Sequence, residues 1–424
     1  MRIGIFTVGS QGDVLPQAAL GEGLVRAGHR VTLVSLETFR ELAHTCGLEF
    51  APVDIDPYAF LRGDIGQSWM SSKNSPLRLL RGVSKAAAQF LSRMNDEALR
   101  ACNGCEAIIY TVPLSISGQT IAEALGVPGI ATAVAPYHPT SEFSSVFVPT
   151  LPFTGKVPNR ISSGVAIQIF WTMMRSHINR WRKTQPQLGP LPRPHPLRAM
   201  SKAGTPWLYG ISPSVIPTPH DWPASAVICG YWFMPASTTW KPPESLVRFL
   251  ESGPAPVYVG FGSMVGANPL ETARIVIQAL EKSGQRGIIA SGWGGLENEA
   301  HSDTIYTIDQ VPHEWLFPQL AAVVHHGGAG TTAAALRAGV PSLVVPYFYD
   351  QYFWAQRVYS LGVGARPIPS RELTVENLSE SLGRMIVDQG VRDKCRSLAQ
   401  SIQSENGVER AVSEIEGYLR KLNR

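Results

Sequence analysis

The chain has 424 residues, of which 44% are hydrophobic and 17% charged, which fits a soluble globular protein of two or three domains and excludes a largely disordered chain. Its formal net charge of +4 does not favour nucleic acid as a partner, and no RNA- or DNA-binding motif occurs. Five cysteines do not form a disulfide framework, so the lone CxxC of Cys102 and Cys105 is expected to be a reduced, partly buried pair.

A first series of strands and helices is expected before residue 235. Arg2–Val8 has the pattern of a buried strand, and the glycine-rich turn that follows leads into a helix over Val14–Ala27 and a strand over His29–Ser35. Such a β-loop-α-β unit begins a parallel, doubly wound sheet. Further strands are expected at 107–111 and 129–133, and further helices at 121–125 and 167–183.

The same alternation restarts after the proline-containing segment 235–243. Strands are expected at 257–261, 287–290, 321–325 and 342–345, and helices at 270–282, 332–338, 377–388, 391–404 and 407–422. The predicted class is therefore α/β, with an N-terminal domain 1–234, a linker 235–244, a C-terminal domain 245–405 and a last helix 406–424 that could pack on the N-terminal domain. Open α/β sheets bind ligands at the carboxyl ends of their strands, so a central cleft between the domains is expected.

The N-terminal apolar run is too short for a signal peptide, and no uncharged apolar stretch of about 18 residues occurs. We expect a cytoplasmic protein whose contact with a membrane, if any, is peripheral.

The segment His325–Thr332 lies where a predicted strand turns into a helix. Glycines let backbone N–H groups approach an anion closely, and the start of a helix adds the positive end of its dipole. His326 and the hydroxyls of Thr331 and Thr332 could donate further hydrogen bonds. We interpret the segment as a diphosphate cradle, and close packing at the helix start is the competing explanation.

Two further positions carry side chains suited to chemistry. Asp350 and Gln351 could bind the hydroxyls of a hexose, although Asp350 alone would be interpreted as a helix N-cap. Asp13, at the carboxyl end of the first strand, is either the N-cap of the next helix or a general base that takes the proton of an acceptor hydroxyl. His138 is a second candidate for that base.

Together these motifs resemble those of the UDP-glycosyltransferase superfamily, whose members have the GT-B fold of two Rossmann-like domains facing a cleft. The HHGGAGTT segment with Asp350 and Gln351 after it is similar to the subgroup of sterol glucosyltransferases, vancomycin-type glycopeptide glucosyltransferases and rhamnolipid rhamnosyltransferases. Segments 9–14, 256–263 and 291–293 agree with this resemblance. Segments 179–182, 221–223 and 230–233 look most like the sterol glucosyltransferase branch.

The resemblance implies a role for each matching residue. The phosphates of the donor would be held by Ser263, His326, Gly328, Ala329, Gly330 and Thr331. The uracil and ribose would lie near Trp293, Gln310, Val311 and His313; plant members carry a Trp where this chain has Gln310. Asp350 and Gln351 would hold the sugar, Ser10 and Gly12 would complete the donor site, and Asp13 would be the catalytic base.

The implied activity is an inverting transfer of a hexose, with glucose favoured, from a UDP-sugar to the hydroxyl of an apolar acceptor such as a sterol, a steroid or another lipid-like natural product. No metal and no cofactor besides UDP-glucose is expected. Apolar residues between about 60 and 200 suit such an acceptor. We assign Phe143 and Trp171, together with His138, to the acceptor region. The basic aromatic stretch Trp171–Lys183 either faces a membrane or packs within the domain with its arginines in solvent.

Other activities remain open at this point. The acceptor could be a polyketide, glycopeptide or glycolipid, with a dTDP- or UDP-sugar as donor, because the same phosphate cradle serves both nucleotides. A UDP-sugar epimerase is a more remote alternative with the same donor class.

Overall fold

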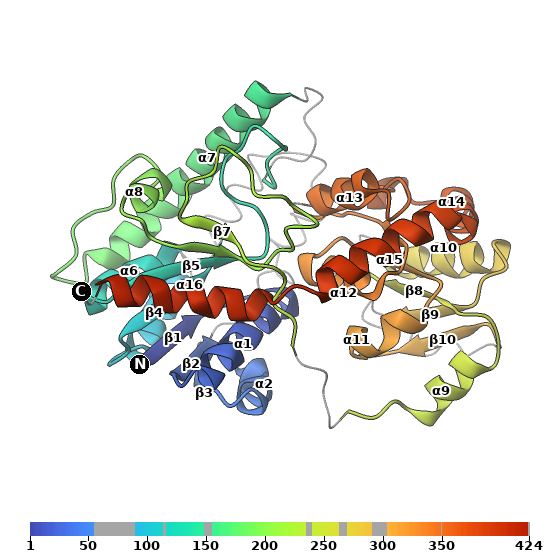
Figure 1. The fold of residues 1–424 in the computed structure, drawn as a ribbon, viewed down its shortest axis with the longest axis horizontal. Helices are drawn as coiled ribbons and strands as arrows, with labels where there is room; N and C mark the ends of the chain where they lie inside the picture. The colour runs from blue at the N-terminus through green and yellow to red at the C-terminus, as the bar shows by residue number, and fades with distance from the viewer. Residues whose placement is uncertain are drawn as a thin grey trace. The chain divides into compact units, whose positions relative to one another are not determined.

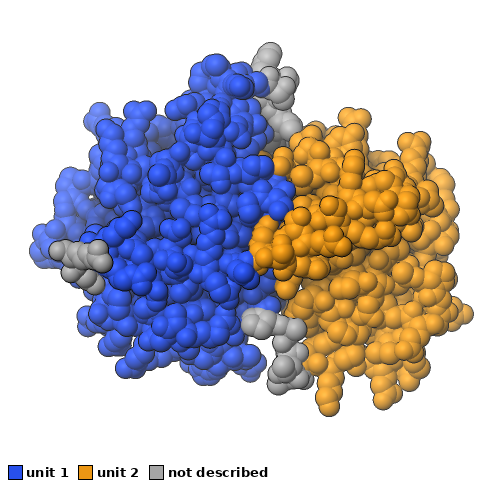
Figure 2. Space-filling model, in the orientation of Figure 1, with its two compact units in different colours: residues 1–234, 406–424 blue, residues 235–405 orange. Residues whose placement is uncertain are grey.

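The computed structural model describes residues 1–54, 90–112, 116–147, 155–234, 240–262, 269–290, 303–348 and 350–422. The chain divides into unit 1, which comprises Met1–Met234 and Asn406–Arg424, and unit 2, which comprises Pro235–Glu405 (Figures 1 and 2). Each unit is built on one parallel sheet. Within the described ranges, no helix is both long enough and apolar enough to span a bilayer.

Unit 1 contains a sheet in the order β3-β2-β1-β4-β5-β6-β7. Its strands are β1 (Arg2–Phe6), β2 (Arg30–Ser35), β3 (Glu49–Pro52), β4 (Ala107–Thr111), β5 (Gly129–Ala133), β6 (Trp207–Tyr209) and β7 (Ala226–Ile228). Every residue of β4 and β5 is buried, as expected of central parallel strands covered on both faces. The strand order reverses between β1 and β4, and ligands bind beside such a point in open α/β sheets.

The helices of unit 1 cover both faces of its sheet (Figure 1). They include α1 (Gln11–Arg26), α2 (Arg40–Thr45), α6 (Ile116–Leu125), α7 (Lys156–Arg182), α8 (Leu197–Lys202) and α16 (Gly407–Leu422). The C-terminal helix α16 packs on α1. A Cβ at Gly23 of α1 would lie 2.3 Å from Cγ1 of Val408, so the glycine is what lets the two helices approach.

Unit 2 contains a sheet in the order β10-β9-β8-β11-β12. Its strands are β8 (Val257–Gly260), β9 (Gly287–Ala290), β10 (Ile305–Ile308), β11 (Ala322–His325) and β12 (Ser342–Val344). Its helices are α9 (Glu244–Glu251), α10 (Pro269–Lys282), α11 (His313–Leu316), α12 (Ala329–Ala338), α13 (Asp350–Leu361), α14 (Val375–Val387) and α15 (Gln389–Gln403). Apolar side chains of β8, β11, α10 and α14 form one continuous core.

The structure differs from the sequence-based expectation at the starts of several helices and in elements that the sequence did not predict. Helix α7 begins at Lys156, eleven residues before the predicted start at residue 167, because Pro158 is tolerated in the first turn of a helix. Helix α1 begins at Gln11 rather than Val14. The short strands β3, β6, β7 and β10 and the helices α2, α8, α9, α11 and α13 were not among the expected elements.

Candidate active site

In unit 1, Asp13 lies in the first turn of α1, directly after the carboxyl end of β1. The N-cap is Ser10, so the alternative that Asp13 is the N-cap is wrong; Asp13 is the third helical residue and closes a capping box. Its Oδ2 accepts hydrogen bonds from the Ser10 backbone N at 2.9 Å and from the Ser10 Oγ at 3.1 Å. A Cβ at Gly9 would lie 2.3 Å from this Oδ2, so only glycine leaves room for the carboxylate.

The surroundings of Asp13 change its proton affinity. Desolvation raises the pKa of this carboxyl above its ordinary value, although both hydrogen bonds from Ser10 act to lower it. The side chain keeps part of its surface exposed, so a ligand can still reach it. A carboxylate with a raised pKa is a better proton acceptor than an ordinary aspartate, which is what a general base requires.

In unit 2, the turn between β11 and α12 presents free backbone donors. Gly328 is the N-cap of α12, so the N–H groups of Ala329, Gly330 and Thr331 have no acceptor within the helix. Gly327 has φ of 89°, and a Cβ there would lie 2.7 Å from Cγ1 of Val344 and 3.0 Å from the backbone O of Gln351. The glycine thus brings the start of α13 against the turn, which places the two predicted donor-binding segments side by side.

The two histidines of this turn have different roles. His325 is fully buried, and its Nδ1 accepts a hydrogen bond from the backbone N of Gly327 at 3.1 Å, so this residue shapes the turn. The His326 ring lies close to two glycines: a Cβ at Gly328 would be 2.5 Å from its Nε2, and one at Gly262 would be 3.1 Å from its Cε1. Burial lowers the pKa of His326 to about 4. At neutral pH the ring therefore carries no charge and has one N–H to donate, and a hydrogen bond with the Gly260 backbone acts to raise its pKa.

Two of the predicted donor-binding side chains already have partners within unit 2. The Thr332 hydroxyl is buried and donates to the Gly328 carbonyl at 2.9 Å, so it is not a phosphate donor. The Gln351 Oε1 accepts from the backbone N of Tyr347 at 2.8 Å and of Phe348 at 3.2 Å. This leaves the Thr331 hydroxyl and the Gln351 amide nitrogen for a ligand. Asp350 is partly exposed as the first residue of α13.

The remaining predicted donor residues are only partly described. His313 begins α11 and stacks on Phe317, with ring centroids 4.3 Å apart. Burial lowers the pKa of His313 to about 4. Gln310 is exposed and Val311 is half-buried just before α11. Ser263 and Trp293 lie outside the described residues.

Unit 1 contains a cavity of about 350 Å³ beneath α7, bounded by α6, α8 and the start of β6. Its apolar lining includes Val112, Phe147, Ile167, Phe170, Trp171 and Trp207. Of the three residues predicted for the acceptor, Trp171 lines this cavity, whereas His138 and Phe143 do not.

Two histidines lie near this cavity, and only His138 was named as a candidate from the sequence. His138 is buried, with its Nδ1 2.5 Å from the Tyr209 hydroxyl, and burial lowers its pKa to about 3. It is thus a core residue without access to an acceptor. His195, which no motif marked within its proline-rich loop, does line the cavity. Its Nδ1 accepts from the backbone N of Leu197 at 3.0 Å, so in the neutral ring Nε2 carries the proton.

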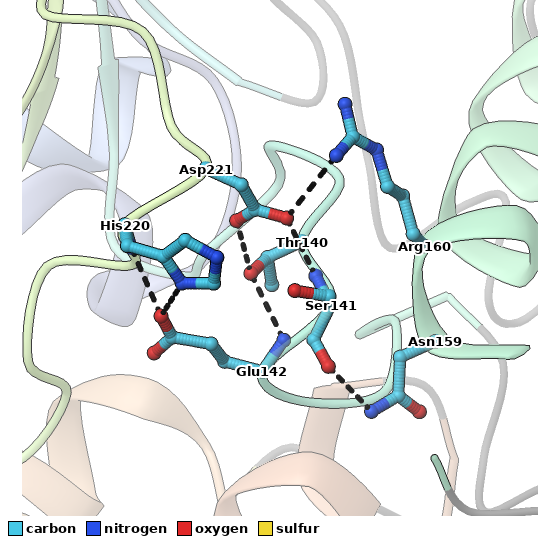
Figure 3. Close-up of polar contacts among 7 residues, drawn as sticks. All are labelled: Thr140, Ser141, Glu142, Asn159, Arg160, His220 and Asp221. Atoms are coloured by element: carbon cyan, nitrogen blue, oxygen red, sulfur yellow. Dashed lines mark hydrogen bonds and ion pairs between the residues drawn. The ribbon is translucent and has the colours of Figure 1, made fainter. Parts of the chain in front are cut away.

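Asp221 stabilises the loop that follows β5 by accepting hydrogen bonds from it (Figure 3). It accepts hydrogen bonds from the Thr140 hydroxyl at 2.7 Å and the Ser141 backbone N at 2.9 Å, and Arg160 of α7 lies 3.7 Å away. Desolvation opposes ionisation, but these hydrogen bonds lower the pKa of Asp221 below its ordinary value. The segment 221–223 was noted only for its resemblance, and nothing in its pattern indicated this role.

The basic aromatic stretch 171–183 is largely packed within unit 1. Trp171 and Trp181 are buried. Arg182 is also buried; it pairs with Glu123 at 2.6 Å and donates to the Gly189 carbonyl at 2.7 Å. The Arg175 Nε donates to the carbonyls of the proline-rich loop, at 2.9 Å from the Leu191 O. The stretch therefore follows the packing alternative more than the membrane alternative.

Two family models match the chain. Residues 3–144 match the glycosyltransferase family 28 N-terminal domain, and residues 295–417 match the erythromycin biosynthesis protein CIII-like C-terminal domain. The sterol 3-beta-glucosyltransferase UGT80B1 of Arabidopsis thaliana is 35% identical over 99% of this chain and 68% of its own length. UGT80A2 of the same plant is 36% identical over 97% and 64%, and the sterol 3-beta-glucosyltransferase of Candida albicans is 33% identical over 99% and 28%. The chain thus spans about two thirds of these plant relatives and under a third of the fungal one.

Solved structures with the same fold are glycosyltransferases. The kitacinnamycin glycosyltransferase superposes with a TM-score of 0.72 at 19% identity, covering 99% of each chain. The calicheamicin glycosyltransferase CalG4 gives 0.68 at 18% identity, covering 100% of this chain and 99% of that one. These likenesses confirm the expected GT-B fold. The sequence relatives show that the chain belongs to the glycosyltransferase family that contains the sterol 3-beta-glucosyltransferases.

Proposed function

We propose that the chain transfers glucose from UDP-glucose to the hydroxyl of a sterol, with inversion at the anomeric carbon and without a metal. The observation that carries this proposal is the desolvated carboxylate of Asp13 at the carboxyl end of β1, in a chain whose relatives are named sterol 3-beta-glucosyltransferases. The acceptor oxygen forms a bond to the anomeric carbon, the bond from that carbon to the diphosphate oxygen breaks, and Asp13 takes the hydroxyl proton.

The turn at α12 suits the leaving diphosphate. The free N–H groups of Ala329, Gly330 and Thr331, aligned with the helix dipole, would stabilise the negative charge that develops there. The Thr331 hydroxyl supplies a further donor, and the N–H of the neutral His326 ring would supply another by turning from the Gly260 backbone to the diphosphate. We propose uridine as the base of the donor, although a solved neighbour, SsfS6, is complexed with thymidine diphosphate.

The cavity of unit 1 suits the apolar body of the acceptor. Its volume of about 350 Å³ lies within the range of small-molecule sites, and aromatic rings form much of its wall. A sterol presents a rigid hydrocarbon body and a single hydroxyl, so apolar contacts would supply its affinity and Asp13 would engage its polar end.

The test is product analysis by mass spectrometry. The purified chain is incubated with UDP-glucose, dTDP-glucose or UDP-galactose, and with a 3β-hydroxysterol or the corresponding 3-ketone. We expect a hexosylated product only when UDP-glucose and the hydroxysterol are combined. The absence of a hexosylated sterol with every donor would refute the sterol assignment, and conversion of a UDP-sugar without any acceptor would favour an epimerase.

Replacing Ser10 by alanine is expected to move the acidic limb of the pH profile of kcat/KM to higher pH. The Ser10 hydroxyl lowers the pKa of Asp13, so its removal raises that pKa, and protonation then inactivates the base at a higher pH than in the wild type. Ser245→Ala, in the first turn of α9, is the control. An unshifted limb would show that Asp13 is not the group that titrates.

Replacing Phe170 by alanine is expected to raise the acceptor KM roughly tenfold with little change in the UDP-glucose KM, because one aromatic wall of the cavity is lost. Thr172→Ala is the matched control, since Thr172 is exposed two residues further along α7 and does not line the cavity. The acceptor is supplied in detergent. Equal KM values for both variants would place the acceptor elsewhere.

A further inference from the structure

The N-terminal half of α7 carries an exposed row of aliphatic side chains. Val157, Ile161, Val165 and Ile169 are 67%, 59%, 52% and 44% exposed. Their spacing of four residues places them within an arc of about 120° along about 18 Å of helix. Figure 1 shows these turns at the outer edge of unit 1. We name these four residues the α7 stripe.

The stripe is not needed to attach α7 to unit 1. The opposite face does this through buried Ile167, Trp171, Met174 and Ile178. In the described part of the chain, the other exposed large apolar side chains lie singly on separate elements: Met1, Leu270, Tyr359, Val387 and Leu422. Scattered apolar residues need no explanation, whereas a contiguous row of them marks a surface that meets another apolar phase.

The charges of the helix favour one partner. No acidic residue occurs between Gly155 and Lys183. The stripe's face continues toward the C-terminal end of the helix with Arg180 and Lys183, which are both exposed. Neither is among the ion pairs of the described residues, to which α7 contributes Arg160 and Arg182. An apolar face continued by cations is complementary to a bilayer with anionic headgroups.

We propose that the α7 stripe docks on the surface of a bilayer containing anionic lipid, with Arg180 and Lys183 at the headgroups. The choice of a bilayer rests on the proposed function, because a sterol acceptor resides in membranes. The inner face of the same helix lines the acceptor cavity through Ile167, Phe170 and Trp171. Docking would therefore hold this cavity beside the phase that supplies its ligand.

The test is co-sedimentation of the full chain with vesicles of phosphatidylcholine, with and without phosphatidylglycerol. The vesicles contain neither sterol nor donor, so binding is independent of transfer. Ile161→Gln with Val165→Gln is expected to lower the partition coefficient at least roughly tenfold on anionic vesicles. Arg180→Gln with Lys183→Gln is expected to remove only the gain that phosphatidylglycerol provides. The matched control is Val387→Gln with Leu422→Gln, which also removes two exposed aliphatic side chains.

Several outcomes would overturn the proposal: no binding of the wild type, equal binding of the stripe and control variants, or a wild-type dimer that the stripe variant dissociates, since a second copy would then cover the stripe. Transfer to sterol dispersed in detergent is measured in parallel and should be unchanged in the stripe variant. If the wild type showed no transfer to sterol in detergent, the proposed function would be refuted, but the result of the vesicle experiment would be unaffected.

Discussion

Asp13→Asn is expected to reduce kcat by at least about 10²–10⁴-fold while UDP binding is retained. The amide oxygen of asparagine can still accept both hydrogen bonds that Ser10 donates, so the start of α1 is preserved. What is lost is the ability to accept a proton from the acceptor hydroxyl. Initial rates at saturating sterol and calorimetric titration with UDP separate the two effects.

The matched control for this variant is Asp388→Asn. Asp388 is the N-cap of α15, where its Oδ1 accepts from the Val391 backbone N at 3.1 Å, so the same exchange is made at a capping carboxylate in unit 2. Its kcat should equal that of the wild type. If Asp13→Asn retained kcat within a few-fold, or lost UDP affinity to the same extent as activity, Asp13 would be a structural capping residue only.

Much of the fold can be predicted because the central strands are encoded locally. β1, β4 and β11 are short apolar runs that end in glycine-rich or irregular segments, and such runs in alternation with helices indicate a parallel sheet. The three-residue strands β6 and β7 show no such period, so only pairing with β5 and with each other identifies them as strands. The early start of α7 was hidden because proline was interpreted as a sign of irregular structure.

The sequence identifies the residue types of the candidate site, but it does not show which of their polar atoms are free to bind a ligand. Thr331 and Thr332 are equivalent in the motif, yet the turn of α12 directs only the Thr332 hydroxyl to the Gly328 carbonyl. Likewise, His138 and His195 are both isolated histidines, and tertiary packing alone decides which one lines the cavity. Sequence periodicity indicates a face of a helix or strand, but it does not say which partner already satisfies a polar atom there.

Gly328→Ala is expected to weaken UDP binding roughly tenfold or more, because the added methyl disturbs the cradle. Its Cβ would lie 2.5 Å from Nε2 of His326, so the imidazole must leave its place beside the free N–H groups of α12. The backbone itself permits alanine, since Gly328 has φ of −62° and ψ of 143°. Gly383→Ala in α14 is the control, because a Cβ there meets nothing within 4 Å and UDP affinity should not change.

A double-mutant cycle identifies the cause. If Gly328→Ala acts by displacing the imidazole, then His326→Ala alone and the double variant should weaken UDP binding to a similar extent, because the ring can be lost only once. Calorimetric titration of all four proteins with UDP measures the coupling. Losses that add would mean that the methyl blocks the helix N-terminus directly and that His326 contributes separately. If both single variants bound UDP with unchanged affinity, the diphosphate would not bind at this turn.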